Sequence, residues 1–288
     1  MLAIIGGSEA HKLLPELCPE AVRLGPVDTP FGRSQPVFQV TFGQAQALFL
    51  PRHGERGYEL AAPFVNYRAN IYALRELGAR RIIAWSGPGA IAENLAVGQY
   101  VVPDDCLDET TARPRTFFEG TGLGFVRQNP VFCPELREAL IAAARATGRP
   151  VAERATYACT EGPRLETPAE VRKLKLLGAD VVGMTLAPEL FLARELAMCY
   201  AMVCYISNFA EGLRPRPYRA GELFEGLLEQ GEAKAVRAAV AGLAEIVSAV
   251  AREVYGKQPR CPCPHSMDRY IREGRVSEDW HTWVAPWH

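Results

Sequence analysis

Short apolar runs alternate along the chain with longer segments whose apolar positions recur at three- and four-residue intervals. Short runs bounded by turn residues predict buried strands, and the helical spacing predicts amphipathic helices. The expected strands are Leu2–Gly7, Pro36–Phe42, Ala47–Pro51, Arg81–Ser86, Gln99–Pro103, Ala155–Thr160, Asp180–Met184 and Tyr200–Ser207. The expected helices are Phe64–Leu77, Pro134–Thr147, Pro168–Leu177, Pro188–Ala197 and a long one from about Glu222 to Tyr255.

Proline and glycine mark the boundaries of these helices. Pro134, Pro168 and Pro188 stand in first turns, and Gly78 follows the first helix, as expected of helix starts and stops. The alternation predicts an α/β fold, in which residues 1–256 form a single domain with a mixed central β-sheet flanked by helices. Residues 257–288 are rich in proline, tryptophan and charge without periodicity. We expect them to form an irregular C-terminal extension, which could lie over a neighbouring subunit.

The net charge and the lengths of the apolar runs argue against nucleic acids and membranes as binding partners. The chain has 288 residues, of which 48% are hydrophobic, and a formal net charge of −1. That balance argues against a surface for nucleic acid or anionic membranes, because such binding requires a cationic field. The apolar N-terminus lacks the basic flank and length of a signal peptide, and no apolar run reaches the roughly 20 residues of a membrane span. A cytoplasmic location is therefore expected.

Cysteines are mostly scattered singly, and core packing is the expected role for most of the eight. Cys261 and Cys263 form a Cys-Pro-Cys pair close to His265. Without a second Cys/His pair at metal-ligand spacing, the sequence does not predict a zinc site here. A disulfide is one alternative, and a plain surface pair is the interpretation that we favour.

Candidate chemistry lies in glycine-adjacent turns that follow predicted strands. These turns are Gly6-Gly7-Ser8-Glu9, Arg52-His53-Gly54 and Ser86-Gly87-Pro88-Gly89. Taken singly, the first is better explained as an ordinary strand-to-helix turn, the second is about equally well explained as a surface ion pair, and each signal is weak. Because ligands of open α/β sheets bind beyond the carboxyl ends of strands, the shared position of the three predicts an oxyanion site.

Later polar segments add further candidates. Glu166 stands just before a predicted helix start, where the helix dipole alone favours an acid and Thr167 could cap the helix. Thr185 ends the segment Val182–Thr185, and Asn208 follows a very apolar strand, where Asn is common simply as a turn former.

Together these segments resemble the trimeric purine nucleoside phosphorylase and methylthioadenosine phosphorylase family from Ile4 to about Val250. Several long motifs in register are far more specific than one glycine pattern. The most specific stretches are Leu50–Gly54, Val65–Asn70, Thr160–Glu170 and Gly178–Thr185 with Pro188-Glu189.

The resemblance implies a nucleoside phosphorylase-like fold and a reaction that needs no metal and no organic cofactor, with inorganic phosphate as co-substrate. It implies a homotrimer or a dimer of trimers, in which a neighbour's residue completes each site. The phosphate ligands that it implies are Ser8, Arg52, His53, Ser86, Gly87 and Thr185. Met184 would lie beneath the ribose, and Leu165 stands where the family usually has a Phe beside the base. The implied catalytic residues are Asn208, His53 and Ser86.

The resemblance implies that base specificity depends on Glu166 and Asn208. Family members acting on 6-aminopurines carry an aspartate pair where this chain has Asn208 and Ala210, whereas members acting on 6-oxopurines resemble this chain. A carboxylate accepts the N1–H of hypoxanthine or guanine, but it meets the N1 lone pair of adenine. An Asn amide can donate to O6 while its oxygen accepts a proton on N7. Inosine, guanosine or 5′-methylthioinosine is therefore the expected purine nucleoside substrate.

The chain also departs from the family pattern. Glu55 and Gly57 replace an Arg and a His, so that Arg56 or Tyr58 would have to rebuild those contacts. Residues Gly221–Leu228 contain no His of the kind that binds a 5′-hydroxyl, and Phe224 or Leu223 could instead line an apolar pocket for a methylthio group. Two alternatives remain open: a methylthioadenosine phosphorylase, and a catalytically silent purine or nucleoside binder. An oxidoreductase is a poor interpretation, because Gly6-Gly7-Ser8 lacks G-x-G-x-x-G spacing.

Overall fold

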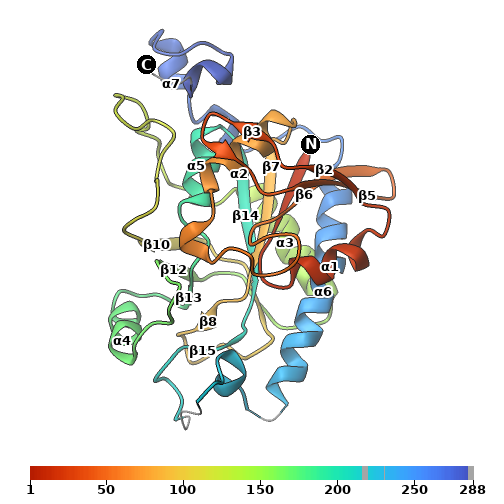
Figure 1. The fold of residues 1–288 in the computed structure, drawn as a ribbon, viewed down its shortest axis with the longest axis vertical. Coiled ribbons are helices and arrows are strands. Elements are labelled where there is room, and N and C mark those ends of the chain that lie inside the picture. The colour runs from red at the N-terminus through yellow and green to blue at the C-terminus, as the bar shows by residue number, and fades with distance from the viewer. Residues whose placement is uncertain (216–219, 230, 285–288) are drawn as a thin grey trace.

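A computed structural model describes residues 1–215, 220–229 and 231–284 and confirms the predicted α/β fold (Figure 1). The main sheet has eight strands in the order β11-β9-β14-β7-β1-β6-β5-β2. Their bounds are β1 Leu2–Gly6, β2 Val22–Gly25, β5 Val37–Phe42, β6 Ala45–Pro51, β7 Arg81–Ser86, β9 Tyr100–Val101, β11 Val151–Ala152 and β14 Cys199–Tyr205.

The main sheet is mixed, as expected. Strand β1 pairs in parallel with β6 and β7, and β7 pairs in parallel with β14. The outer pairs β5–β6 and β9–β14 are antiparallel. Because β1, β6 and β7 are parallel neighbours, the turns that follow them all emerge at one edge of the sheet.

Helices cover both faces of this sheet, and neighbouring residues of its central strands face opposite cores. Ile5 of β1 belongs to one hydrophobic cluster, together with buried residues of α2 (Tyr67–Glu76) and α5 (Glu189–Glu195). Ile4 packs in the other with α1 (Ala10–Leu17), α3 (Pro134–Ala146) and α6 (Glu232–Val254). In Figure 1 these two groups of helices lie on opposite sides of the central strands. Burial on both faces explains why the central strands are apolar without alternation.

A second sheet of five strands, β10-β12-β13-β8-β15, extends from the main one toward the lower part of Figure 1. Its strands are β8 Gly89–Ala90, β10 Asp105–Glu109, β12 Thr156–Thr160, β13 Val181–Gly183 and β15 Asn208–Phe209. Helix α4 (Pro168–Leu176) packs beside it, and a further two-stranded ribbon joins β3 (Asp28–Thr29) to β4 (Gly32–Arg33). Strands β8 and β15 run in parallel with Asn208 opposite Gly89, which brings the segment after β7 beside the segment after β14.

Some elements differ from the sequence prediction. The last long helix begins at Glu232 instead of near Glu222, because Gly231 has a positive φ of 94° and precedes it as a left-handed cap. The segment Phe224–Leu227 forms a separate 3-10 helix. The protein also contains α1, β2 and β10, which the hydrophobic pattern did not predict. Among the described residues, no helix is both long and apolar enough to cross a bilayer.

The tail, for which no regular element was expected, contains short helical segments and packs on its own chain. These segments are Cys263–His265, α7 (Asp268–Arg272) and Trp280–Trp283. Met267, Tyr270, Trp280 and Trp283 join the core that α2 and α5 share.

The burial of the cysteines confirms one prediction and contradicts another. Cys18, Cys133, Cys159, Cys199 and Cys204 are buried, as expected for core residues. Cys261 and Cys263 are only 5% and 1% exposed, so the predicted surface pair is wrong. The tail folds back over the main core, and this contact is invisible to local pattern.

Candidate active site

One cavity of about 890 Å³ lies at the edge where the central strands end, and all the candidate site residues line it. They are Ser8, Arg52, His53, Ser86, Gly87, Leu165, Glu166, Met184, Thr185 and Asn208. They follow different strands of both sheets, from β1 to β14, so the fold gathers segments that are far apart in the sequence.

The turn after β1 is built on a close approach of two backbones. A Cβ added to Gly7 would lie 2.5 Å from the carbonyl oxygen of Trp85 at the end of β7, so only glycine fits there. The indole Nε1 of Trp85 donates to the Ser8 carbonyl at 3.1 Å. These contacts hold the Ser8 hydroxyl at the cavity, where it lies 2.7 Å from the hydroxyl of Tyr58.

Arg52 lies directly after β6 and is fully buried. Its Nε and Nη2 donate to the two carboxylate oxygens of Glu189 at 2.6 and 2.7 Å, and the Tyr200 hydroxyl donates to the same carboxylate at 2.7 Å. Burial by itself lowers the pKa of Arg52, but Glu189 outweighs it and the pKa is raised, so the guanidinium stays charged. The sequence analysis predicted Arg52 as an anion ligand, but it did not predict this partner. The Pro188-Glu189 motif was the only sign of it.

His53 lines the cavity, and its ring has a defined tautomer. Its Nδ1 lies 2.8 Å from the carbonyl oxygen of Leu60, an acceptor, so Nδ1 carries the proton. Burial, with Arg52 as a second cause, lowers the pKa of His53 to about 4, and the ring is therefore neutral at pH 7. The Tyr58 ring stacks on the imidazole at a centroid distance of 4.3 Å. Nε2 is consequently an acceptor, and within the described chain it is buried without a hydrogen-bond partner.

Thr185 and Ser86 place hydroxyls in the same cavity. Thr185 Oγ1 is buried near the Tyr157 hydroxyl, but it has no hydrogen bond of good geometry among the same described residues. Ser86 Oγ lies 3.3 Å from the Tyr157 hydroxyl. Buried polar atoms are almost always satisfied in proteins, and these two unsatisfied atoms belong to residues that line one cavity, which favours a polar ligand there.

The other polar end of the cavity carries a carboxylate and an amide. Thr160 Oγ1 donates to Glu166 Oε1 at 2.5 Å, which fixes the carboxylate. The helix cap is a different residue pair: Thr167 and Glu170 form a reciprocal capping box at the start of α4. Asn208 is 5% exposed, and its Oδ1 lies 2.6 Å from the hydroxyl of Ser207. Glu166 is thus not needed as a cap, and its position at the cavity calls for another explanation.

Arg113 is a buried residue that the sequence analysis missed. Its guanidinium donates to the carbonyl oxygens of Met184 at 2.7 Å, Ala187 at 2.6 Å and Glu161 at 2.6 Å, and to the Glu161 carboxylate at 3.1 Å. It therefore ties the segment before Glu166 to the segment that carries Met184 and Thr185. Arg113 lies in a loop without periodicity, and no local motif marks it.

The structure shows the contacts of the residues at which this chain departs from the family pattern. Glu55 forms a surface ion pair with Arg23 at 2.8 Å, and Arg56 pairs with Glu59 at 2.8 Å away from the cavity lining. Gly57 has a φ of 124°, a conformation that strains any residue with a side chain. Tyr58, one of the two residues expected to rebuild the contacts, is the one that reaches the cavity.

An apolar wall closes a further part of the cavity. Leu223, Leu227, Val236 and Val240 line it, from the 3-10 helix and the start of α6. Leu223 was one of the two residues predicted for this wall, whereas the side chain of Phe224 lies outside the described part of the chain. His53 is the only histidine among the described lining residues.

Comparison with known proteins gives a consistent picture. Residues 1–247 match the family model of the phosphorylase superfamily. The chain is 42% identical over 238 residues to the 6-oxopurine nucleoside phosphorylase of Pyrococcus furiosus, covering 80% of this chain and 88% of that one. It is 38% identical over 267 residues to a probable S-methyl-5′-thioinosine phosphorylase of Methanothermobacter thermautotrophicus, covering 93% of this chain and 89% of the relative.

A solved structure has the same fold. A methylthioadenosine phosphorylase from an antarctic soil metagenomic library superposes with a TM-score of 0.84 at 27% identity, covering 99% of this chain and 97% of its own. The match therefore extends over both sheets, the flanking helices and the C-terminal tail.

Proposed function

This chain belongs to the phosphorylase superfamily and is a purine nucleoside phosphorylase, a pentosyltransferase, and we propose that it acts on 6-oxopurine nucleosides: inosine, guanosine or 5′-methylthioinosine. The observation that carries this proposal is the Glu166 carboxylate, held by Thr160 at the cavity that Asn208 also lines. The carboxylate accepts the N1–H of a 6-oxopurine and repels the N1 lone pair of adenine. The relatives named for 6-oxopurine and methylthioinosine substrates support the same class.

In this proposal, inorganic phosphate occupies the end of the cavity formed by Ser8, Arg52, His53, Ser86, Gly87 and Thr185. Arg52 supplies a fixed positive charge, and the three hydroxyls supply donors. The neutral His53 offers an acceptor at Nε2, which suits the P–OH proton of hydrogen phosphate. Phosphate would satisfy both of the polar atoms that are buried without partners.

The proposed reaction forms no covalent bond between the protein and the substrate. The C1′–N9 bond breaks as phosphate oxygen bonds to C1′, and the transition state carries positive charge on the sugar and negative charge on the purine. Phosphate held below C1′ stabilises the first charge. Asn208 Nδ2 donates to O6, and this bond strengthens as negative charge moves onto the base. The departing purine takes up a proton at N7 from solvent, Asn208 Oδ1 accepts from that N7–H, and the P–OH of the new phosphate ester gives up a proton to solvent in turn. The products are a free purine and a ribose 1-phosphate, or its 5′-methylthio derivative.

The sugar lies between these ends, over Met184. Leu165 faces the base where related enzymes carry an aromatic ring. The apolar wall of Leu223, Leu227, Val236 and Val240 favours a 5′-methylthio group over a 5′-hydroxyl, since burying a hydroxyl without a partner costs about 1–3 kcal/mol. Methylthioinosine should therefore have a higher kcat/KM than inosine, and a large preference for inosine would remove this part of the proposal.

A substrate panel tests the proposal directly. Inosine, guanosine, methylthioinosine, adenosine and methylthioadenosine are incubated with and without phosphate, and free base is measured. We expect phosphate-dependent release of hypoxanthine and guanine. Preferred cleavage of methylthioadenosine would instead establish the methylthioadenosine phosphorylase suggested by the solved relative. Nucleoside binding without base release would establish a silent binder.

We also propose that the chain assembles as a homotrimer or a dimer of trimers, in which a neighbouring copy completes each site. The resemblance to trimeric phosphorylases supports this assembly. Phe125, whose side chain is 82% exposed in the loop before α3, is a large apolar group of the kind that subunit interfaces cover.

A further inference from the structure

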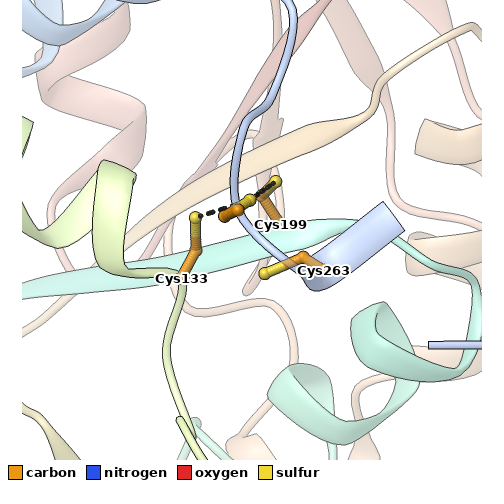
Figure 2. Close-up of side chains that lie close together, drawn as sticks. Cys133, Cys199 and Cys263 are labelled. Atoms are coloured by element: carbon orange, nitrogen blue, oxygen red, sulfur yellow. Dashed lines mark hydrogen bonds between the residues drawn. The ribbon is translucent and has the colours of Figure 1, made fainter. Parts of the chain in front are cut away.

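Four cysteines from three parts of the chain meet where the C-terminal tail packs against the main sheet. Cys133 is the N-cap of α3, Cys199 begins β14, and Cys261 and Cys263 belong to the tail. All four are buried, and their sulfur atoms all lie within 4.8 Å of one another. Figure 2 shows the labelled Cys133, Cys199 and Cys263 turned toward a common space.

The distances fit shared ligation better than sulfur–sulfur bonds. Cys261 Sγ lies 3.5 Å from Cys133 Sγ and 3.4 Å from Cys199 Sγ, so it is nearly equidistant from two partners. A disulfide requires a separation of about 2.05 Å and joins each sulfur to one partner only. A zinc ion with Zn–S bonds of about 2.3 Å places its four sulfurs about 3.8 Å apart along the edges of a tetrahedron.

We propose that Cys133, Cys199, Cys261 and Cys263 form a structural site for a tetrahedral divalent metal ion, with zinc as the fitting ion. Four thiolates fill the coordination sphere and leave no open position for a substrate, as in structural zinc sites. Binding releases the four thiol protons to solvent and leaves the ion with four thiolates at a net charge of −2. No change of oxidation state is involved.

A helix N-terminus and a cation lie beside two of the four cysteines. Cys133 lies at the N-terminus of α3, a helix of 13 residues whose positive dipole end faces the ligands there. Arg81 of β7 is the register partner of Cys199, and its guanidinium donates to the carbonyl oxygen of Lys257 at 2.5 Å. The same guanidinium lies 4.0 Å from the Glu135 carboxylate in the first turn of α3, so this cation is shared between an acid and the start of the tail.

The site explains how the tail is attached. The match to the superfamily model ends at residue 247, and the tail that follows returns over α3 and β14 at Cys261 and Cys263. A metal there would join the tail to the main sheet, next to the segments that carry Tyr270 and Trp280 into the core. The metal is separate from the cavity, whose lining contains none of the four cysteines.

The test measures metal directly and does not depend on catalysis. The intact protein is purified under reducing, chelator-free conditions, loaded with Zn²⁺, desalted and assayed for zinc per chain. Co²⁺ is loaded in parallel for its absorption spectrum. We expect about one ion per chain and a cobalt spectrum with the charge-transfer bands of thiolate ligation. Cys261→Ser and Cys199→Ser should lose tight binding by at least tenfold, whereas Cys18→Ser, a buried cysteine outside the cluster, should keep it.

A second readout covers variants that fold poorly. Chelation should lower the melting temperature of the wild type and of Cys18→Ser, and should speed proteolysis within residues 257–284, with little effect on Cys261→Ser. The proposal is overturned if the reduced, folded wild type takes up no zinc. It is equally overturned if intact mass shows the cluster as disulfides that re-form in preference to metal binding. Because neither readout involves nucleosides, this result is independent of the substrate panel.

Discussion

At the scale of single residues, the base end of the cavity depends on which atoms donate and which accept. Ser207 lies within hydrogen-bonding distance of Asn208 Oδ1, and Thr160 donates to Glu166 Oε1, so neighbouring hydroxyls orient both candidate base-binding groups. Such orientation matters because an amide that reorients exchanges its donor for its acceptor. Specificity here therefore follows from hydrogen-bond polarity more than from shape.

Replacing Asn208 by Asp tests that polarity. The carboxylate cannot donate to O6 of a 6-oxopurine but can accept from the 6-amino group of adenine. We expect kcat/KM for inosine to fall by roughly tenfold or more, equivalent to about 1.4 kcal/mol or more, and the ratio of adenosine to inosine activity to rise. Steady-state kinetics on both substrates measure it. Asn129→Asp, the same change outside the cavity lining, should leave the ratio unaltered, and an unchanged ratio in Asn208→Asp would contradict the assigned role.

His53 makes stability depend on pH. Its pKa falls from 6.5 in the unfolded chain to about 4 in the fold, so between these values the unfolded chain binds the additional proton. Stability from this group is complete above pH 6.5 and is lost as the pH falls toward 4, by about 3 kcal/mol in total. Glu195, whose pKa burial raises to about 7, acts in the opposite direction: its contribution falls as the pH rises from 4.5 toward 7.

The variant His53→Asn isolates this contribution, because Asn can still donate to the Leu60 carbonyl but does not titrate. Urea unfolding at several pH values should show the wild type losing up to about 3 kcal/mol more than the variant between pH 6.5 and 4. Glu195 is present in both proteins, so its effect cancels. Tyr58→Phe, which alters the stacked ring without removing the imidazole, should keep the wild-type slope. Parallel curves for wild type and His53→Asn would show that the imidazole is not desolvated.

At the scale of elements, local pattern located most strands and helices but not their long-range partners. The central strands were predicted because burial on both faces gives continuous apolar runs, and α4 was predicted because Pro168 and Thr167 mark its start. Helix α1, which contains Pro15, and β10, which is largely polar, give no such signal. The candidate site residues were predicted from their position at strand ends and from the family resemblance. Arg113 and the Glu189 partner of Arg52 act through contacts across the fold, which spacing along the chain does not encode.

The ion pair between Arg52 and Glu189 links β6 to α5, and breaking it should be costly. Glu189→Gln leaves a fully buried guanidinium uncompensated, so we expect unfolding free energy to drop by about 3–5 kcal/mol. Added phosphate should recover more stability in this variant than in the wild type, because it supplies the missing negative charge. Chemical denaturation with and without phosphate measures both effects. Glu55→Gln, which breaks the surface pair with Arg23, should cost at most about 1 kcal/mol. Equal losses in the two variants would mean that the buried pair is not the link that the geometry implies.

At the scale of the whole molecule, each chain gathers every candidate site residue in one cavity, whereas in the proposed trimer a neighbouring copy would complete that cavity. A trimer would have a mass of about 95 kDa, three times the 31.7 kDa of one chain. Light scattering coupled to size exclusion should give this value or its double.

Phe125→Asp should weaken the assembly, because it would place a charge where an interface buries an apolar ring. Phe64→Asp changes another highly exposed aromatic residue and serves as the comparison. If Phe125 lies in the interface, its variant should dissociate into monomers at low micromolar concentration, and its affinity for nucleoside should fall as it dissociates. Its melting temperature should then depend on protein concentration. A wild-type chain that remains monomeric and fully active at all concentrations would show that one cavity is sufficient, and would overturn the proposed contribution of a neighbour.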